Sequence, residues 1–208
     1  ALIGFLTPIV KGCLTEWAIE CTYHAQQCFG GHGYIAEWGM EQLARDARIT
    51  TLYEGTTGIQ ALDLMGRKIM QQQAAGLRVF LGMIESFCAE HAGNPAVAEF
   101  VPTLRSLAAD WQALTLKVGQ RGAANADELG AAAWDYLFYS GYAALAYWWA
   151  RSVAAAEASN HSEAFKASKR ETARFYFARL LPRTLAHAAA IETGTAPLMS
   201  LSAEGFGD

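Results

Sequence analysis

Residues 52–60 (LYEGTTGIQ) bring together side chains of this sequence that could transfer a proton. Glu54 supplies a carboxylate, and it comes just before what the pattern predicts to be the start of a helix. A carboxylate becomes a useful general base when an apolar pocket desolvates it. Gly55 would allow the backbone to approach a ligand closely. Taken alone, however, Glu54 could simply stabilise the positive end of the next helix, and Gly55 could be an ordinary turn residue.

A second candidate region is the glycine-rich turn of residues 27–34 (QCFGGHGY). A double glycine after a helix is, by itself, a typical helix stop. The turn is not a dinucleotide-binding fingerprint, because Gly31 and Gly33 follow a helix and not a strand. His32 is expected to be a loop histidine with a hydrogen-bonded neighbour. Further along, the pair Arg45 and Asp46 is expected to form an ion pair or to cap the loop.

Helices must position these residues. Thr7 and Pro8 resemble a helix start, a hydroxyl cap followed by proline, and helix-compatible residues then continue to about residue 29. A shorter helix is predicted over residues 39–48, followed by a brief extended segment at residues 49–51. Helical periodicity resumes at residue 56, with Thr56 or Thr57 as the cap.

The rest of the chain reads as long helices with almost no strand-like alternation, so the predicted fold is an all-α helical bundle. Two helical layers are expected to join near residues 71–73, and Pro102 and Pro182 are expected to mark kinks or boundaries. The last residues, 194–208, are predicted to lie as an extended tail over the bundle. The predicted helix breaks are residues 93–95, 122–125 and 159–162.

Composition sets further limits. The 208 residues are 52% hydrophobic and 17% charged, which is enough apolar material for a large core. The net charge is -4 and the basic residues form no long run, which argues against a nucleic-acid partner. The sequence shows no signal peptide, and because it opens on apolar residues without an initiator methionine, we expect it to be part of a longer protein.

The four cysteines include no C-x-x-C pair, so no metal site is predicted. They are expected to be buried free thiols in a reducing compartment, which indicates a cytoplasmic protein. Their positions are Cys13, Cys21, Cys28 and Cys88.

Residues 136–150 (YLFYSGYAALAYWWA) are uncharged and aromatic. About 20 residues are needed to span a bilayer, so this stretch is too short and no transmembrane segment is predicted. A core helix is the favoured interpretation, and a peripheral membrane or partner-binding face is the alternative. Several tryptophans are likewise expected in the core or at an interface: Trp38, Trp111, Trp134, Trp148 and Trp149.

Together, residues 27–34, 45–49 and 52–60 resemble the C-terminal domain of the acyl-CoA dehydrogenases, flavoenzymes that desaturate acyl-CoA thioesters. In that family, the glutamate of the Tyr-Glu-Gly-Thr motif takes the pro-R α proton while a hydride passes from the β carbon to flavin N5. The resemblance implies that Glu54 is the catalytic base. It also implies that Gly55 lies against the acyl-CoA substrate.

The resemblance implies FAD as the cofactor, with two groups of residues in contact with it. One group follows the predicted base and meets the nucleotide part of FAD: Thr56, Thr57 and Gly58. Gly58 stands where many relatives have Gln or Glu, so its contact would involve the backbone alone or be lost. The other group reaches the FAD of the neighbouring subunit: Gln27, Cys28, Phe29, Gly30 and Gly31.

Residues 71–208 resemble the extra C-terminal helical domain of a subgroup that includes methylthiopropanoyl-CoA dehydrogenases. The likeness is carried by residues 132–136 and 174–182. Residues 1–70 would then be part of the family's C-terminal helical domain, and residues 71–208 an extension. The whole enzyme would be a homodimer or homotetramer that passes electrons to electron-transfer flavoprotein or a similar acceptor. The 208 residues alone are expected to be inactive.

Two alternatives belong to other classes. A noncatalytic assembly or dimerisation module could keep the motifs by descent. A related flavin fold could act on nitroalkanes or alkylated DNA, but such relatives usually alter the glutamate or add a basic face, and neither change occurs in this sequence.

Overall fold

A computed structural model describes residues 1–207, and within them every regular element is helical, as predicted. π-helical turns continue α3 through Asp63–Gln71 and α7 through Tyr176–Leu180. The α-helices are α1 (Leu2–Cys28), α2 (Met40–Ile49), α3 (Thr57–Leu62), α4 (Ala75–His91), α5 (Val101–Ala124), α6 (Asp127–Glu157), α7 (Glu163–Phe175), α8 (Arg183–Thr193) and α9 (Ala196–Met199).

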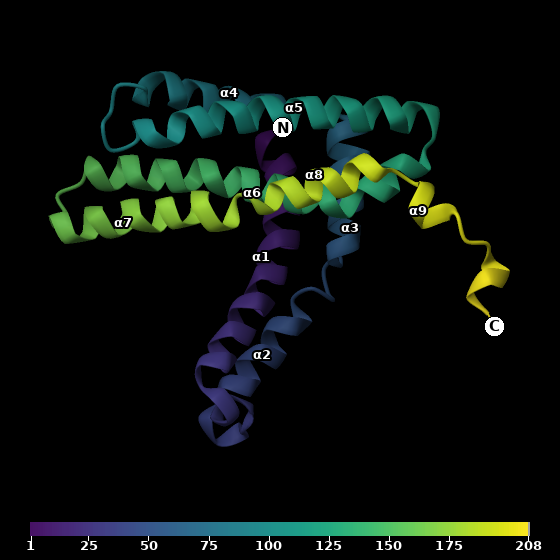
Figure 1. Cartoon of the computed structure of the whole chain (residues 1–208), viewed down its shortest axis with the longest axis horizontal. Helices are drawn as coiled ribbons and strands as arrows, with labels where there is room; N and C mark the ends of the chain where they lie inside the picture. The colour runs from purple at the N-terminus through teal and green to yellow at the C-terminus, as the bar shows by residue number, and fades with distance from the viewer. Residues whose placement is uncertain (208) are drawn as a thin grey trace.

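The helices form a layered body with a projecting arm (Figure 1). α4 and α5 lie antiparallel along one side, and α6, α7 and α8 lie beneath them. α1 begins within this body and leaves it, and α2 returns antiparallel along the outer half of α1 to complete the arm. The arm carries both candidate regions identified from the sequence.

One continuous hydrophobic core joins the beginning of the chain to the later helices. Phe5 of α1 lies 6.5 Å, ring to ring, from Phe80 of α4 and 6.0 Å from Trp111 of α5. Trp111 is completely buried and donates a hydrogen bond from Nε1 to the Tyr136 hydroxyl at 3.2 Å. That hydroxyl also bonds the Thr115 hydroxyl at 2.7 Å, so the side-chain polar atoms of these three residues are satisfied.

Residues 136–150 form the buried part of α6, which confirms the core-helix interpretation. α1 crosses α6 closely because glycines stand at the crossing. A Cβ at Gly141 would collide with Cys13, and one at Gly12 would collide with Leu137. Burial of Cys13 at this crossing raises the pKa of its thiol to about 12.

The predicted start of the first helix is wrong, because α1 already begins at Leu2 and Pro8 lies inside it. The Thr7 hydroxyl donates to the Ile3 carbonyl at 2.8 Å and does not cap a helix. By length and composition alone, α1 could cross a membrane, and it is the one helix among residues 1–207 that could. Within the chain it packs against α2, α3, α4 and α6.

Three other local expectations need correction. Residues 49–51 are not extended, because α2 runs through Ile49 and the Thr50 hydroxyl then donates to the Ala47 carbonyl at 2.6 Å. α5 continues through residues 122–124, and the chain becomes extended only at Asn125. The tail is not extended over the bundle: Thr195 bonds Glu128 of α6, and α9 and a 3-10 turn at Ala203–Phe206 then lead away from the body (Figure 1). Its last residue, Asp208, lies outside the described residues.

The other predicted breaks are confirmed. α4 ends just before residues 93–95, and α7 follows residues 159–162 with Ser162 as its cap, whose hydroxyl accepts from the Phe165 amide at 3.3 Å. Pro102 lies in the first turn of α5, and Pro182 separates the π turn from α8.

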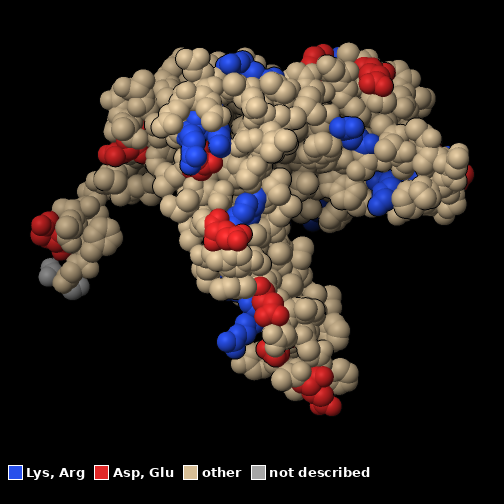
Figure 2. Space-filling view, turned by 180° about the vertical axis from the view of Figure 1, so that it is seen from behind, with Lys and Arg blue, Asp and Glu red and all other residues tan. Residues whose placement is uncertain are grey.

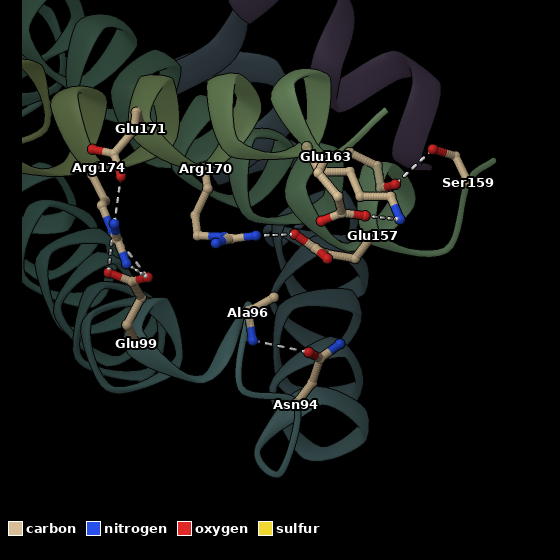
Figure 3. A network of polar contacts seen from close by, with 11 residues as sticks. Asn94, Ala96, Glu99, Glu157, Ser159, Glu163, Arg170, Glu171 and Arg174 are labelled. Carbon is tan, nitrogen blue, oxygen red and sulfur yellow. Dashed lines mark hydrogen bonds and ion pairs between the residues drawn. The ribbon is translucent and has the colours of Figure 1, made fainter. Parts of the chain in front are cut away.

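Ion pairs join α7 to the end of α6 and to the turn before α5 (Figure 3). Arg174 of α7 contacts Glu99 at 2.8 Å and also pairs with Glu171 at 2.5 Å. Arg170 pairs with Glu157 at the end of α6 at 2.5 Å. Partly exposed pairs of this kind contribute little stability individually, so they help to align α7 on a body that the hydrophobic core holds together.

The expectation of buried cysteines holds only for Cys13 and Cys88, since Cys21 and Cys28 lie on exposed faces of α1 in the arm. Of the tryptophans expected in the core or at an interface, Trp111 lies in the buried core, and no finding tests an interface role for the other four. Trp38, on the arm, is 52% exposed, because little of the chain covers the arm. Three others lie on outer faces of α6 or are only partly buried: Trp134, Trp148 and Trp149.

Candidate functional site

The loop between α2 and α3 carries the predicted base, and a lysine from α1 holds this loop. Lys11 Nζ donates hydrogen bonds to the Thr50 carbonyl at 2.9 Å and to the Gly55 carbonyl at 2.7 Å. The same ammonium lies 5.9 Å from the centre of the Tyr53 ring. One side chain therefore contacts both ends of residues 50–55.

Glu54 and Gly55 both adopt left-handed backbone conformations, with φ of 53° and 86°. This conformation is unfavourable for a glutamate and costs about 1–2 kcal/mol. A Cβ at Gly55 would in addition come within 2.5 Å of Gln60 Nε2, so glycine is required there on both counts. The Glu54 side chain is exposed, and the Gln60 amide donates to the Glu54 and Gly55 carbonyls at 3.4 Å.

α3 begins directly after these two residues. Thr56, one of the two predicted caps, caps it, and its hydroxyl accepts from the Ile59 amide at 3.4 Å. Thr57 is buried and donates a hydrogen bond from its hydroxyl to Glu16 Oε1 of α1 at 2.6 Å. Gly58 is open, since a Cβ there would meet no atom within 4 Å.

Lys11 and Glu16 therefore support the junction, and the sequence reasoning missed both. A signal was present: Lys11 is the one lysine or arginine in the first 28 residues, within a helix whose first half is mainly apolar. A lone cation on such a helix indicates that some acceptor must come from elsewhere in the chain.

The glycine-rich turn lies at the far end of the arm (Figure 1). Gly30 has φ of 58° and ends α1, which confirms the predicted helix stop. Gln26 Nε2 donates to the Gly33 carbonyl at 3.1 Å and closes the turn. The five residues that the resemblance assigns to a neighbouring cofactor are all exposed: Gln27, Cys28, Phe29, Gly30 and Gly31.

The other two local expectations turn out differently. His32 packs edge-on against Trp38, with ring centres 5.2 Å apart. Asp46 accepts hydrogen bonds from Gln42 Nε2 at 3.1 Å within α2, and no ion pair between Arg45 and Asp46 occurs among residues 1–207.

The structure thus brings one group of predicted residues together and separates the other. Residues 54–58 form a single loop-to-helix junction. The turn of residues 27–31 lies at the opposite end of α2, a helix of 10 residues and hence about 15 Å long. Within one chain, the two groups cannot contact the same small reacting centre.

Both groups fit the close approach of a cofactor to the backbone. Gly30, Gly31 and Gly58 have no atom within 4 Å of where a Cβ would lie. Exposed hydroxyl and amide groups near a helix start can bind phosphate or other polar groups of a nucleotide. The geometry of these residues is therefore compatible with the FAD that the resemblance implies.

The arm also presents an extensive apolar surface. Tyr34 is 82% exposed, and other large apolar side chains of the arm and its loop are about half exposed: Tyr23, Phe29, Ile35, Trp38, Leu43, Ile49, Leu52 and Tyr53. Figure 2 shows the arm from behind, with charged side chains scattered over wide uncharged areas. A concentration of exposed large apolar side chains is typical of a surface that contacts other protein.

Comparison with known proteins matches the chain to two family models in succession. Residues 4–70 match the acyl-CoA dehydrogenase C-terminal domain, and residues 80–202 match a family described as acetyl-CoA dehydrogenase C-terminal like. The all-α fold and these two matches define the class, the helical C-terminal segments of acyl-CoA dehydrogenases. The chain belongs to the acyl-CoA dehydrogenase family and corresponds to its C-terminal part.

Three curated relatives illustrate the similarity. The chain is 43% identical over 99 residues to a 3-methylmercaptopropionyl-CoA dehydrogenase of Ruegeria pomeroyi, an alignment that covers 48% of this chain and 17% of the relative. It is 40% identical over 89 residues to a broad-specificity linear acyl-CoA dehydrogenase of Mycobacterium tuberculosis, covering 43% and 15%. It is 36% identical over 92 residues to a butyryl-CoA dehydrogenase of Syntrophomonas wolfei, covering 44% and 15%. The matched part of the chain thus spans about a sixth of each relative.

Proposed function

We propose that this chain is the C-terminal portion of an FAD-dependent enzyme that desaturates acyl-CoA thioesters between the α and β carbons. The observation that carries the proposal is the junction of residues 54–58, in a chain of this family. There Glu54, whose backbone is left-handed, comes directly before a glycine and the capped start of α3.

In this proposal, a carboxylate oxygen of Glu54 accepts the proton that leaves the α carbon of the thioester. When bound, FAD supplies the acceptor for the hydride that leaves the β carbon. The left-handed backbone at Glu54 and Gly55 fixes the direction in which the carboxylate leaves the loop. Gly55, which lacks a side chain, leaves room for the acyl-CoA beside the base.

The proposed cofactor contacts come from both ends of α2. Thr56 and Gly58 would contact FAD at the start of α3, whereas Thr57, whose buried hydroxyl bonds Glu16, would contact it only through its backbone. The exposed turn of residues 27–31 would contact the FAD of a neighbouring subunit, and its distance from Glu54 along α2 supports a role outside its own subunit.

We also propose the division and setting of the whole protein. Residues 1–70 would be part of the family's C-terminal helical domain, and residues 71–208 an extension. The full enzyme would be a homodimer or homotetramer in the cytoplasm, would use electron-transfer flavoprotein or a similar acceptor, and would require regions outside this chain for activity.

Anaerobic bleaching of the flavin by a panel of acyl-CoAs tests the role of Glu54 in the full-length enzyme. Glu54→Gln should slow bleaching by about 10²–10⁴-fold, because the amide cannot accept the proton. Glu90→Gln is a control that removes an exposed carboxylate of α4 and should leave the rate unchanged. Bleaching that survives Glu54→Gln would place the base elsewhere.

The same experiment addresses the noncatalytic assembly module, which the exposed apolar surface of the arm also suits. A full-length protein that contains no flavin, and whose oligomeric state is unaffected by Glu54→Gln, would favour that alternative over the dehydrogenase.

A further inference from the structure

We propose that Lys11 is a positioning residue that holds the loop carrying Glu54 in its reactive conformation, an inference that rests on the proposed role of Glu54. Lys11 lies on α1, more than 40 residues before the base in sequence. Its ammonium group reaches across to the loop and touches both of its ends.

The contacts are unusually concentrated on one short segment. Lys11 Nζ donates to the carbonyls of Thr50 and Gly55, which bracket residues 51–54, at 2.9 Å and 2.7 Å. It also lies 5.9 Å from the Tyr53 ring centre, within reach of a cation–π interaction. Two carbonyls of this six-residue segment are therefore bonded to a single nitrogen atom, and one of its aromatic rings lies near that atom.

The Lys11 ammonium group donates hydrogen bonds to these carbonyls and forms no ion pair with a carboxylate of the described residues. Among residues 1–207, no carboxylate oxygen lies within 4.0 Å of its Nζ. A partly buried ammonium without a counter-ion must be satisfied by neutral acceptors, and hydrogen bonds from a charged donor are roughly twice as strong as neutral ones. The loop carbonyls are those acceptors.

The loop needs such a restraint because its conformation is strained. Glu54 has φ of 53°, and a strained residue keeps such a conformation only when its surroundings hold it. Gln60 Nε2 also donates to the Glu54 and Gly55 carbonyls, but at 3.4 Å, which is near the limit of a hydrogen bond. The stronger restraint therefore comes from Lys11.

The test uses the full-length holoenzyme and the variants Lys11→Met and Lys11→Arg. Lys68→Met is the matched control, since Lys68 is also partly buried but pairs with Asp63, which Arg67 continues to contact at 2.6 Å. The measurements are the rate of flavin reduction by acyl-CoA, the dissociation constant of acyl-CoA, the FAD content and the melting temperature.

We expect flavin reduction to be about 100-fold slower in the Lys11→Met enzyme, because a displacement of the Glu54 carboxylate by about 1 Å can lower the rate this much. FAD content and the acyl-CoA dissociation constant should stay close to wild type. Lys11→Arg should recover about 10-fold of the lost rate, because its guanidinium can donate to both carbonyls. Lys68→Met should react like wild type. If Lys11→Met does not yield holoenzyme, Lys11→Gln is measured instead and should show the same selective loss of rate.

A double-variant comparison tests whether Lys11 acts through Glu54. Added to Glu54→Gln, Lys11→Met should cause no further loss of rate. The inference is overturned if the two losses multiply, if Lys68→Met is equally slow, or if Lys11→Met alone reacts normally while Glu54→Gln is inactive. If Glu54→Gln itself reacts at the wild-type rate, the proposed function fails and this inference fails with it.

Discussion

Gly55 must be a glycine for two separate reasons, its backbone conformation and the lack of space for a side chain. Its φ of 86° disfavours any L side chain, and a Cβ would crowd the Gln60 amide, which bonds to the same loop. Gly58, three residues later, has neither restriction, since it lies in α3 with open space around it. The two glycines are alike in sequence and different in physical role.

Gly55→Ala should therefore lower the free energy of unfolding by about 1–2 kcal/mol, the cost of a left-handed conformation for a residue with a side chain. Gly58→Ala is the matched control and should be neutral or stabilising by up to about 1 kcal/mol, because alanine is the better helix former. Thermal unfolding of both variants measures the difference. Equal effects would mean that the loop does not keep its left-handed conformation in solution.

Sequence patterns predicted the residues of this junction but not its support. The order of glutamate, glycine and threonines singled out residues 54–58 as candidates and gave Thr56 or Thr57 as the cap, of which the structure has Thr56. The contacts of Lys11 and Glu16 span about 40 residues of sequence, and no local pattern encodes such a distance. The positive φ of Glu54 was equally hidden, because glutamate has no preference for that conformation.

Among the elements, α6 is the one that most others pack against. It contacts α1, α3, α5, α7 and α8, and its central residues are almost all buried. Two of its tyrosine hydroxyls differ in their hydrogen bonding. That of Tyr136 bonds Trp111 and Thr115, whereas that of Tyr139 has no hydrogen-bond partner among residues 1–207.

Tyr136→Phe should lower the free energy of unfolding by about 1–3 kcal/mol, because it leaves the buried Trp111 Nε1 without an acceptor. Tyr139→Phe removes the same atom from a neighbouring buried ring and should change stability by less than about 0.5 kcal/mol. Urea unfolding gives both values. A comparable loss in the two variants would show that the hydrogen bonds around Tyr136 contribute no net stability.

Helical periodicity predicted most of these elements because long amphipathic or buried helices leave a clear pattern. The misplaced boundaries have local causes. Thr7 and Pro8 carry the composition of a helix start, yet α1 runs through them because the apolar residues before Pro8 are already packed on the body. The β-branched residues 49–51 favour a strand in isolation, but no other strand is present among residues 1–207 to pair with one.

In the whole molecule, the candidate residues lie on the part least covered by the chain itself. The arm exposes Glu54, the turn of residues 27–31 and a wide apolar surface, whereas most of the buried side chains belong to the body. The matched relatives are about six times longer than the aligned region, which supports the proposal that regions outside these 208 residues complete the site.

The isolated 208-residue chain should therefore fold as a helical protein but should not oxidise acyl-CoA when FAD is added. Turnover with an artificial electron acceptor, and flavin absorbance after gel filtration, measure this. Full-length holoenzyme serves as the positive control. Steady oxidation of any acyl-CoA by the purified chain would contradict the expectation.

The shared core has a consequence for how such proteins can be recombined. Phe5 of α1 packs on Phe80 and Trp111, which belong to the later helices, and α6 crosses α1 at two glycines. A cut near residue 70 would expose apolar side chains on both pieces and leave each without its partner. The two segments therefore depend on each other for folding. If a gene fusion joined residues 71–208 to a different acyl-CoA dehydrogenase, that enzyme would need an α1 with the same packing surface.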